Sequence, residues 1–239
     1  MEVFKLIISV VLAYLIGGIQ TSILMSRSMH GDIRKFGSGN AGATNMLRVY
    51  GVKAGLFTLL CDFVKAFIAV GICLLLFLGT NDTYIAHLSV YASGLCVVLG
   101  HNFPIYFGFR GGKGVATSLA VMWAVYGMYM GDWIIPVLTT VIGIIMIAIT
   151  RMVSLGSITG AIVQLIACLI IYANKDAAAC VLSFVLFAML CLRHSKNIVR
   201  IVHGEEKKLS FSKSKDKAEN AEAKNEESED TEEASAKVD

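Results

Sequence analysis

Long apolar stretches recur through the first 192 residues of the sequence, and polar segments separate them. A helix of about 20 apolar residues crosses the roughly 30 Å hydrocarbon core of a bilayer. Hydrophobic residues make up 56% of the chain and charged residues only 16%, which argues against a soluble globular domain. We therefore predict an all-α, polytopic integral membrane protein with about seven transmembrane helices. The expected spans are residues 3–25, 55–78 and 84–99, a stretch after Thr117 that ends near Met130, residues 133–149, a stretch after Ser157 that ends near Ala173, and residues 177–192.

Positive charge is divided unevenly between the two sides that seven alternating spans create. Only Lys5 and Lys175 fall on one side. The positive-inside rule therefore predicts that the N-terminus lies outside and that the C-terminus is cytoplasmic. The cytoplasmic side collects Arg27, Arg34, Lys35, Arg48, Lys53, Arg110, Lys113, Arg151, Arg193, Lys196 and Arg200.

Charge also divides the chain along its length. Residues 1–204 hold 14 Lys and Arg against 6 Asp and Glu, whereas residues 205–239 hold 7 against 12. The second segment has few apolar residues to bury, and segments of this kind do not form a packed core. We expect a membrane-embedded domain over residues 1–204 and a disordered acidic cytoplasmic tail over residues 205–239.

Two glycine-rich segments resemble nucleotide-binding motifs without meeting their requirements. Residues 37–42 match G-x-G-x-x-G, and Asp62 follows at the spacing of the dinucleotide fingerprint. That fingerprint needs a strand before it, whereas an expected membrane span precedes residues 37–42. A P-loop would need Gly in place of Phe107 and Ser or Thr in place of Gly114. Neither a Rossmann site nor a soluble nucleoside triphosphatase is expected.

Motifs for metals and for common nucleophiles are also missing from the sequence. The six cysteines lie inside apolar stretches and form no Cys-x-x-Cys pair, which argues against a zinc site or a disulfide framework. Acidic residues are almost absent from the polar motifs, so we expect neither a metal nor another cofactor. The sequence contains no Gly-x-Ser-x-Gly elbow and no His-x4-Asp motif.

Four polar segments carry groups that suit phosphate binding. Glycine lets backbone N–H groups approach an anion, Arg clamps phosphate bidentately, and Lys acts as a point charge. The positive-inside rule alone explains a single Arg or Lys in a cytoplasmic loop. It does not require the many Gly and Asn residues of the same loops. Two phosphate positions can be built from these donors. The residues of the four segments that offer these groups are, in chain order, Ser38, Asn40, Thr44, Asn45 and Arg48, then Gly111, Gly112, Lys113 and Gly114, then Arg151, Ser154 and Ser157, and finally His194 and Asn197.

The same four segments carry a resemblance to a known family. They read GSGNAGATNMLR at 37–48, HNFPIYFGFRGGKGVAT at 101–117, RMVSLGS at 151–157 and RHSKNIVR at 193–200. In order and spacing they resemble the signatures of the bacterial acyl-phosphate:glycerol-3-phosphate acyltransferase family, the PlsY type. The similarity covers about residues 1–205, and the acidic tail is not part of the family pattern.

The resemblance implies a transferase of phospholipid biosynthesis. The 1-hydroxyl of glycerol 3-phosphate would attack a fatty acyl phosphate and give lysophosphatidate and inorganic phosphate. The implied partners are these two substrates and the lipid bilayer, with no nucleic acid, and the implied site faces the cytoplasm from the bacterial inner membrane. The residues expected around the glycerol phosphate are Ser38, Asn40, Thr44, Asn45, Arg48, His194 and Asn197. Those expected around the acyl phosphate are Gly111, Gly112, Lys113, Gly114, Thr117, Arg151, Ser154 and Ser157.

Lys113, His194 and Ser154 are the expected catalytic residues. An acyl phosphate has a good leaving group, so the site mainly has to hold two anions together and stabilise the developing charge. We expect direct attack, with Lys113 bearing the phosphate charge and with either His194 or the substrate phosphate taking the hydroxyl proton. A covalent acyl-Ser154 route is the alternative.

Two further pairs of residues are expected to support this site. His101 and Asn102 should brace the loop that contains Lys113. Asp62 and Lys65 lie three residues apart inside an expected span, so they should pair toward the bundle interior, with a direct role toward substrate as the alternative.

A membrane transporter of an organophosphate or lipid phosphate is the alternative function, because several spans with cationic patches could line a pathway. A transporter predicts functional polar groups on both faces, whereas the sequence places them on one.

Overall fold

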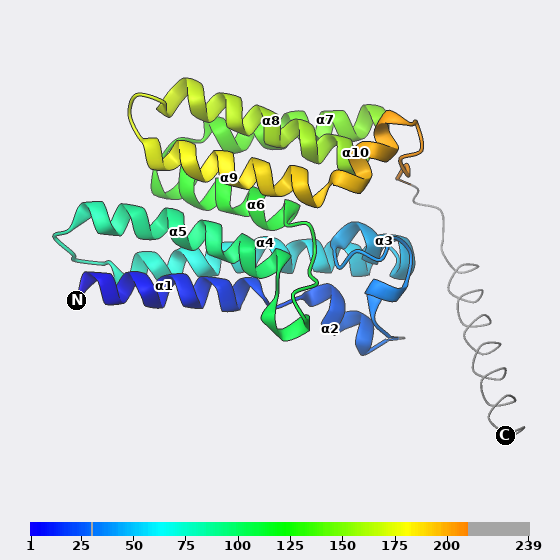
Figure 1. Cartoon of the computed structure of the whole chain (residues 1–239), viewed down its shortest axis with the longest axis horizontal. Helices are drawn as coiled ribbons and strands as arrows, with labels where there is room; N and C mark the ends of the chain where they lie inside the picture. Colours follow the sequence, from blue (N-terminus) through cyan, green and yellow to red (C-terminus); the bar gives the residue numbers. More distant parts are fainter. Residues whose placement is uncertain (30, 210–239) are drawn as a thin grey trace, which may run out of the picture.

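The computed structural model describes residues 1–29 and 31–209, and within these ranges every regular element is helical. The α-helices form an elongated bundle in which the longer ones lie lengthwise (Figure 1). They are α1 (Glu2–Gly17), α2 (Thr21–Arg27), α3 (Ala43–Tyr50), α4 (Val52–Leu76), α5 (Thr83–Asn102), α6 (Val115–Met122), α7 (Ile134–Thr150), α8 (Val153–Tyr172), α9 (Ala177–Arg193) and α10 (Ser195–Val202). Short 3₁₀ turns form η1 (Ile33–Lys35) and η2 (Ile105–Phe107), and η3 (Trp123–Tyr129) continues α6 as a π-helix.

All seven predicted apolar stretches contain helix, which confirms the all-α membrane architecture. By length and composition, four helical segments can cross a bilayer: Glu2–Arg27, Val52–Leu76, Thr83–Phe107 and Val153–Tyr172. Helices α9 and α10 provide a fifth if the pair, bent by 64°, counts as one span. Two further apolar segments, Val115–Tyr129 and Ile134–Thr150, are shorter.

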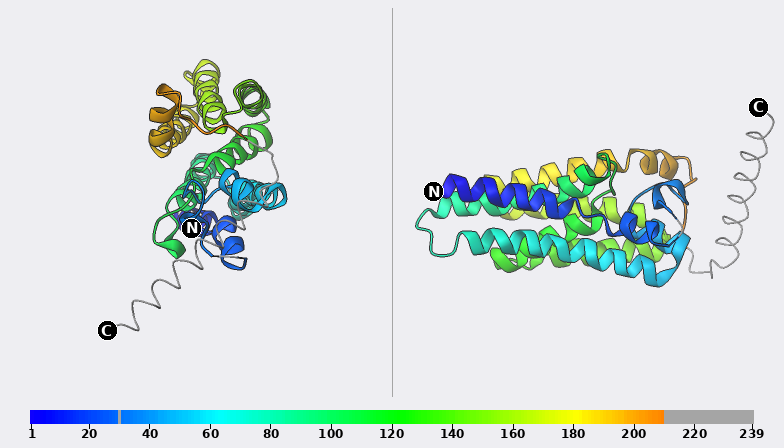
Figure 2. Two further views of the ribbon diagram at one scale, coloured as in Figure 1. Left: turned by 90° about the vertical axis from the view of Figure 1, so that its right-hand side faces the viewer. Right: turned by 90° about the horizontal axis from the view of Figure 1, so that it is seen from below.

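The bundle consists of two groups of helices. Helix α1 packs on α5 and α4, and α8 packs on α7 and α9. Helix α6 packs on α4 and lies between the groups, as the end-on view in Figure 2 makes visible. Many large apolar side chains point outward, among them Leu56, Ile144 and Ile170, which are 62%, 59% and 80% exposed. An apolar exterior of this kind fits a lipid environment.

Helices α1 and α5 touch through their backbones. A Cβ atom on Gly17 would lie 2.1 Å from the Val97 carbonyl oxygen, and one on Gly100 would lie 2.1 Å from the Tyr14 carbonyl oxygen. Small residues at a helix crossing permit this approach, which is common between membrane helices. The contact fixes the C-terminal part of α5, where the chain leaves the helix toward the glycine-rich loop.

The four motif segments meet at one end of the bundle. Helices α2, α3 and α10 lie at that end, whereas the N-terminus and the turn between α8 and α9 lie at the other (Figure 1). The sequence predicted that all four segments share one face, and the arrangement of the helices agrees with this. The third segment is not a loop, however, because α8 begins at Val153 and takes Ser154 and Ser157 into its first turns.

Residues 205–209, which the sequence assigned to the acidic tail, fold back on the bundle. The Leu209 N–H donates to the Arg151 carbonyl oxygen at 2.6 Å, and Glu206 is only 8% exposed. These residues therefore cover the end of the bundle that carries the motifs. The rest of the predicted tail, residues 210–239, lies outside the described residues.

Candidate active site

The glycine-rich loop is clamped between α5 and α9. A Cβ atom on Gly111 would lie 2.0 Å from the His101 carbonyl oxygen, so no larger residue fits there. The Arg193 guanidinium donates to the carbonyl oxygens of Gly111 and Gly112 at 3.0 and 2.8 Å. Gly114 has φ of +78°, a left-handed conformation that favours glycine, and α6 starts directly after it. Close packing at Gly111 and the hydrogen bonds from Arg193 thus hold the loop that carries Lys113 in place.

Lys113 projects from this loop toward α10. Its ammonium donates a hydrogen bond to Asn197 Oδ1. Burial lowers the pKa of Lys113 to about 8, with Glu206 opposing the shift and with Arg200, Arg48 and Arg193 adding to it. At neutral pH the side chain is therefore mostly a cation, surrounded by further cations. Such a cluster attracts anions, and phosphate is the anion that Lys and Arg commonly bind together.

Glu206 joins three of the polar groups at this end, and sequence reasoning missed it. Its Oε1 accepts hydrogen bonds from Ser154 Oγ at 2.6 Å and Asn197 Nδ2 at 2.7 Å, and its Oε2 accepts from Arg200 Nε at 2.9 Å. Burial would raise the pKa of Glu206, but these hydrogen bonds hold it below the usual value. Glu206 is one of twelve acidic residues in 205–239, so no local signal distinguishes it.

The segment before α3 is shaped by Asn45. The Asn45 amide accepts from the Ser38 N–H at 2.9 Å and donates to the Phe36 carbonyl oxygen at 3.0 Å. Asn45 is 1% exposed, so it supports the loop from inside, whereas Ser38 is exposed. Gly37 and Gly39 have positive φ values of +63° and +71°, which permits the sharp turns around Ser38.

Arg48 and the remaining members of that segment differ in their contacts. Arg48 Nη2 lies 3.4 Å from the Lys207 carbonyl oxygen, and its charge acts on Lys113. It therefore faces the same cluster as Glu206. Asn40 and Thr44 are partly exposed, Asn40 just before α3 and Thr44 in its first turn.

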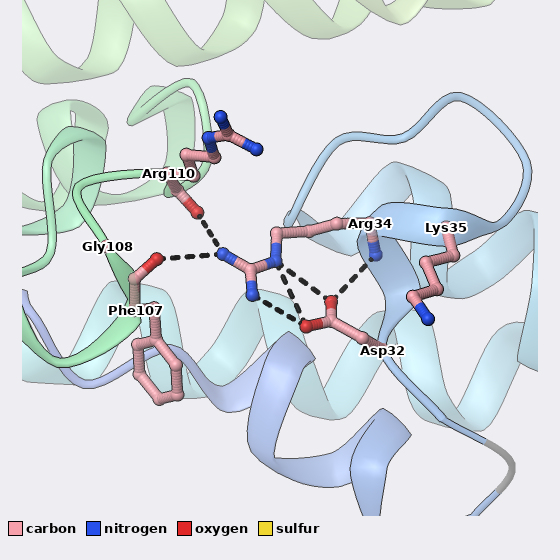
Figure 3. Close-up of a pocket in the computed structure, with 6 residues that line it drawn as sticks. All are labelled: Asp32, Arg34, Lys35, Phe107, Gly108 and Arg110. Carbon is pink, nitrogen blue, oxygen red and sulfur yellow. Dashed lines mark hydrogen bonds and ion pairs between the residues drawn. The ribbon is translucent and has the colours of Figure 1, made fainter.

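A strut connects the segment before α3 with the segment before the glycine-rich loop (Figure 3). Arg34 pairs with Asp32 at 2.6 Å, and its Nη1 donates to the carbonyl oxygens of Phe107 and Arg110 at 2.8 and 3.2 Å. The hydrogen bond from Arg34 is the main reason that the pKa of Asp32 falls to about 2. A cavity of about 490 Å³ lies beside the strut. Its lining includes none of the predicted site residues.

Three predicted residues lie elsewhere or are engaged with the backbone. Ser157 Oγ donates to the Val153 carbonyl oxygen at 2.8 Å, and Thr117 Oγ1 donates to that of Asp62 at 3.2 Å. Thr117 is fully buried. Arg151 is exposed and ends α7 with φ of +59°, and its carbonyl group binds Leu209. Of the hydroxyl groups predicted for the acyl phosphate, Ser154 is the one that reaches Glu206.

His194 lies at the bend between α9 and α10 and is 2% exposed. Its Nδ1 is 2.9 Å from the Leu190 carbonyl oxygen. Because a carbonyl can only accept, Nδ1 carries the proton and Nε2 is left as an acceptor. The tautomer thus suits a general base, and Asn197 lies one helical turn further on.

Asn102, predicted to brace the loop, presses on it directly. A Cβ atom on Gly114 would lie 2.6 Å from Asn102 Oδ1. Asn102 is 1% exposed, and within residues 1–29 and 31–209 neither polar atom of its side chain has a hydrogen-bond partner. The same described ranges contain no group of three or more His, Cys, Asp or Glu placed to hold a metal ion.

The helical bundle and these contacts together define an integral membrane protein with a cluster of cationic and polar side chains at one end. The comparisons with known proteins specify the class further. The model of the glycerol-3-phosphate acyltransferase family matches residues 7–204, and the chain belongs to that family.

Individual relatives agree with the family match. The chain is 42% identical to a glycerol-3-phosphate acyltransferase of Clostridioides difficile, over 89% of this chain and all of that one. It is 38% identical to the Finegoldia magna protein of the same description, over 87% and 98% of the two chains.

Two solved structures are also similar. They are crystal structures of PlsY (YgiH), an integral membrane glycerol 3-phosphate acyltransferase, in its glycerol 3-phosphate and lysophosphatidic acid forms. The TM-scores are 0.74 and 0.72 and the identities 32% and 31%, over 86% of this chain and 96% of those chains.

Proposed function

We propose that the protein is a glycerol-3-phosphate 1-O-acyltransferase that uses a fatty acyl phosphate and forms lysophosphatidate and inorganic phosphate. The observation that carries this is the meeting of Lys113, Ser154 and Asn197, from three separate segments, at one end of a membrane bundle: Ser154 and Asn197 bind the Glu206 carboxylate, and Lys113 binds Asn197. Family membership and the two ligand forms of the similar structures support the acceptor and the product.

Two anions have to be bound side by side for this reaction. In our proposal, Ser38, Arg48, His194 and Asn197 bind the glycerol phosphate, with Asn40 and Thr44 at the edge of that position. Lys113, the glycine-rich loop and Ser154 bind the acyl phosphate. Asn197 hydrogen-bonds to Lys113 and to Glu206, so it belongs at the boundary between the two positions.

The chemical step is direct attack. The 1-hydroxyl oxygen forms a bond to the acyl carbon, the bond from that carbon to the phosphate oxygen breaks, and phosphate leaves with the electron pair. Lys113 and the backbone N–H groups beside it stabilise the charge on the leaving phosphate. His194 Nε2 or the substrate phosphate takes the hydroxyl proton.

We place the protein in the bacterial inner membrane, crossing it seven times, with the N-terminus outside and the site facing the cytoplasm. The positive-inside rule supports this orientation, since the motif end carries most of the Arg and Lys. Helix α7 has 17 residues, which at about 1.5 Å per residue is close to the thickness of the hydrocarbon core. Labelling with a membrane-impermeant maleimide checks the orientation: intact cells should label Lys175→Cys and not Lys35→Cys.

The decisive experiment uses the purified protein in lipid vesicles with acyl phosphate and glycerol 3-phosphate. We expect lysophosphatidate and inorganic phosphate in equal amounts, and loss of both with Lys113→Ala. Uptake of glycerol 3-phosphate into sealed vesicles, without acyl transfer, would instead support the transporter alternative. That alternative has less structural support, because the buried charges Asp62 and Lys65 pair with each other at 2.9 Å.

A further inference from the structure

Three ionisable side chains from α4 and α5 form a buried network inside the bundle. Asp62, Lys65 and His101 are 3%, 6% and 3% exposed. Lys65 Nζ lies 2.9 Å from Asp62 Oδ1, 2.7 Å from His101 Nδ1 and 3.1 Å from the Ile19 carbonyl oxygen. An ammonium group has three N–H donors, and here each one finds an acceptor. The sequence predicted the pairing of Asp62 with Lys65 but not its extension to His101.

The network fixes the tautomer of His101. Because an ammonium can only donate, His101 Nδ1 accepts from Lys65, and the ring proton lies on Nε2. Asp62 in turn holds Lys65 in place from the other side. A buried carboxylate and a buried imidazole thus share one cation, and the orientation of the imidazole ring depends on it.

The far edge of the imidazole faces both substrate-binding segments. A Cβ atom on Gly112 would lie 2.2 Å from His101 Nε2 and 2.7 Å from the Ala41 carbonyl oxygen. His101 therefore lies where the glycine-rich loop meets the segment that leads into α3. The backbone of His101 is held as well, since Gln20 Nε2 donates to its carbonyl oxygen at 2.9 Å.

Helix packing alone does not require such a network. Charges buried at this depth lose hydration, and replacing a buried ion pair by apolar residues is often neutral or stabilising. The packing of α4 on α5 therefore does not by itself explain why three polar residues are buried between these helices. The contact of His101 with Gly112, next to Lys113, supplies a reason.

We propose that Asp62 and Lys65 are positioning residues that act through His101: they hold the imidazole with Nε2 toward Gly112 and so fix the loop that presents Lys113. This inference rests on the proposed acyl transfer. It assigns the buried charges a role in placing the acyl phosphate and gives them no contact with it.

The test compares variants that separate the two edges of the imidazole. The side-chain amide of Asn can take the place of His101 Nδ1, whereas that of Gln can take the place of Nε2. Because the proposal gives Nε2 the contact with the glycine-rich loop, His101→Gln should retain clearly more activity than His101→Asn. Asp62→Asn/Lys65→Met removes both charges together and leaves no unpaired one. A 1 Å misplacement can cost about 100-fold in rate, so we expect kcat to fall about 10- to 100-fold in His101→Asn and in the double variant.

Coupling between the sites gives a second measurement. If Lys65 acts only through His101, adding His101→Asn to the double variant should cause no further loss of kcat. If His101→Asn lowers kcat in the double variant by the same factor as in the wild type, the inference is overturned. It is also overturned if the double variant has the kcat of the wild type, or if His101→Asn is more active than His101→Gln. Thr58→Val, another buried change in α4, is the matched control and should leave kcat unchanged.

A readout independent of turnover separates this inference from the proposed function. Amide hydrogen exchange over residues 108–117 should be faster in the double variant than in the wild type and in Thr58→Val. An inactive wild-type protein would contradict the acyltransferase proposal while the exchange comparison still decides the positioning role. Unchanged exchange in the double variant would overturn that role alone.

Discussion

Ser154 Oγ lies 2.6 Å from Glu206 Oε1, so a side chain at the start of α8 is held by a residue that follows α10. The same carboxylate oxygen accepts from Asn197, whose own amide oxygen accepts from Lys113. A chain of hydrogen bonds therefore runs from the glycine-rich loop through α10 and the segment after it to α8. Loss of one member should disturb the others.

Replacing Glu206 by Gln should weaken this chain, because the neutral amide binds Arg200 less strongly and loses an acceptor for Ser154 or Asn197. We expect kcat/KM for acyl transfer to fall about 10- to 100-fold and the melting temperature to drop by several degrees. Glu205→Gln is the matched control, since Glu205 is exposed. Equal activity in the two variants would contradict a role for the carboxylate.

Lys113 should give the reaction a basic limb in its pH profile. Burial lowers the pKa of Lys113 to about 8, so the cation that we propose binds phosphate is present below this pH and is lost as the pH rises through it. We expect kcat/KM to decline above about pH 8. In Lys113→Arg the guanidinium stays protonated, so the residual activity should lack that decline. A decline at the same pH in both proteins would assign it to another group.

His194→Ala should lower kcat about 10²- to 10⁴-fold if Nε2 takes the hydroxyl proton. KM for glycerol 3-phosphate should change less, because Ser38, Arg48 and Asn197 remain. Initial rates at saturating acyl phosphate measure both constants. Lys196→Ala, at an exposed position two residues further on, serves as the control. Near wild-type turnover without the imidazole would leave the substrate phosphate as the base.

Direct attack predicts that no acyl group is bound to the protein during turnover. Hydroxylamine quenching followed by mass spectrometry of the peptide that contains Ser154 should therefore find no acyl adduct or derived hydroxamate above the level in Ser154→Ala. Accumulation of an acyl-Ser154 peptide with acyl phosphate alone would favour the covalent route, in which Glu206 is placed to accept the serine proton.

Arg34→Gln should loosen the strut between the two segments that we propose bind the substrates. It removes the pair with Asp32 and the donors to Phe107 and Arg110, and we expect KM for glycerol 3-phosphate to rise about 10-fold. Lys35→Gln provides the comparison, because Lys35 is exposed and belongs to the same turn. If the two variants have the same KM, the strut does not position the site.

The sequence predicted that the segments carrying Lys113 and Asn197 share one membrane face, but it assigned the two residues to different substrates and did not predict their hydrogen bond. It could not predict Glu206, whose role depends on how residues 205–209 turn back after α10. The role of Arg193 was hidden for a similar reason: a topogenic charge and a side chain that binds Gly111 and Gly112 look alike in sequence. Ser157 and Thr117 illustrate the opposite case, since their suitable hydroxyl groups donate to backbone carbonyls.

Helix boundaries were predicted well where they coincide with the ends of apolar stretches. They were predicted less well where the local backbone conformation at a helix end sets the boundary. Residues 151–157 looked like a loop because Arg and Ser are polar, yet α8 starts at Val153 once Arg151 has reversed the chain. The break near Gly18 inside the first expected span was also not apparent, because the apolar composition continues through it into α2.

The backbone contact at Gly17 and Gly100 restricts the route by which a fatty chain can enter. An alkyl chain is about 4 Å thick, the spacing of van der Waals contact between carbon atoms, and the crossing of α1 with α5 has no gap of that width. An alkyl chain therefore cannot pass between the two helices at this crossing. The fatty substrate of the proposed reaction should thus reach Lys113 through another side of the bundle, and a photoreactive group at the end of its chain should crosslink to residues outside this crossing.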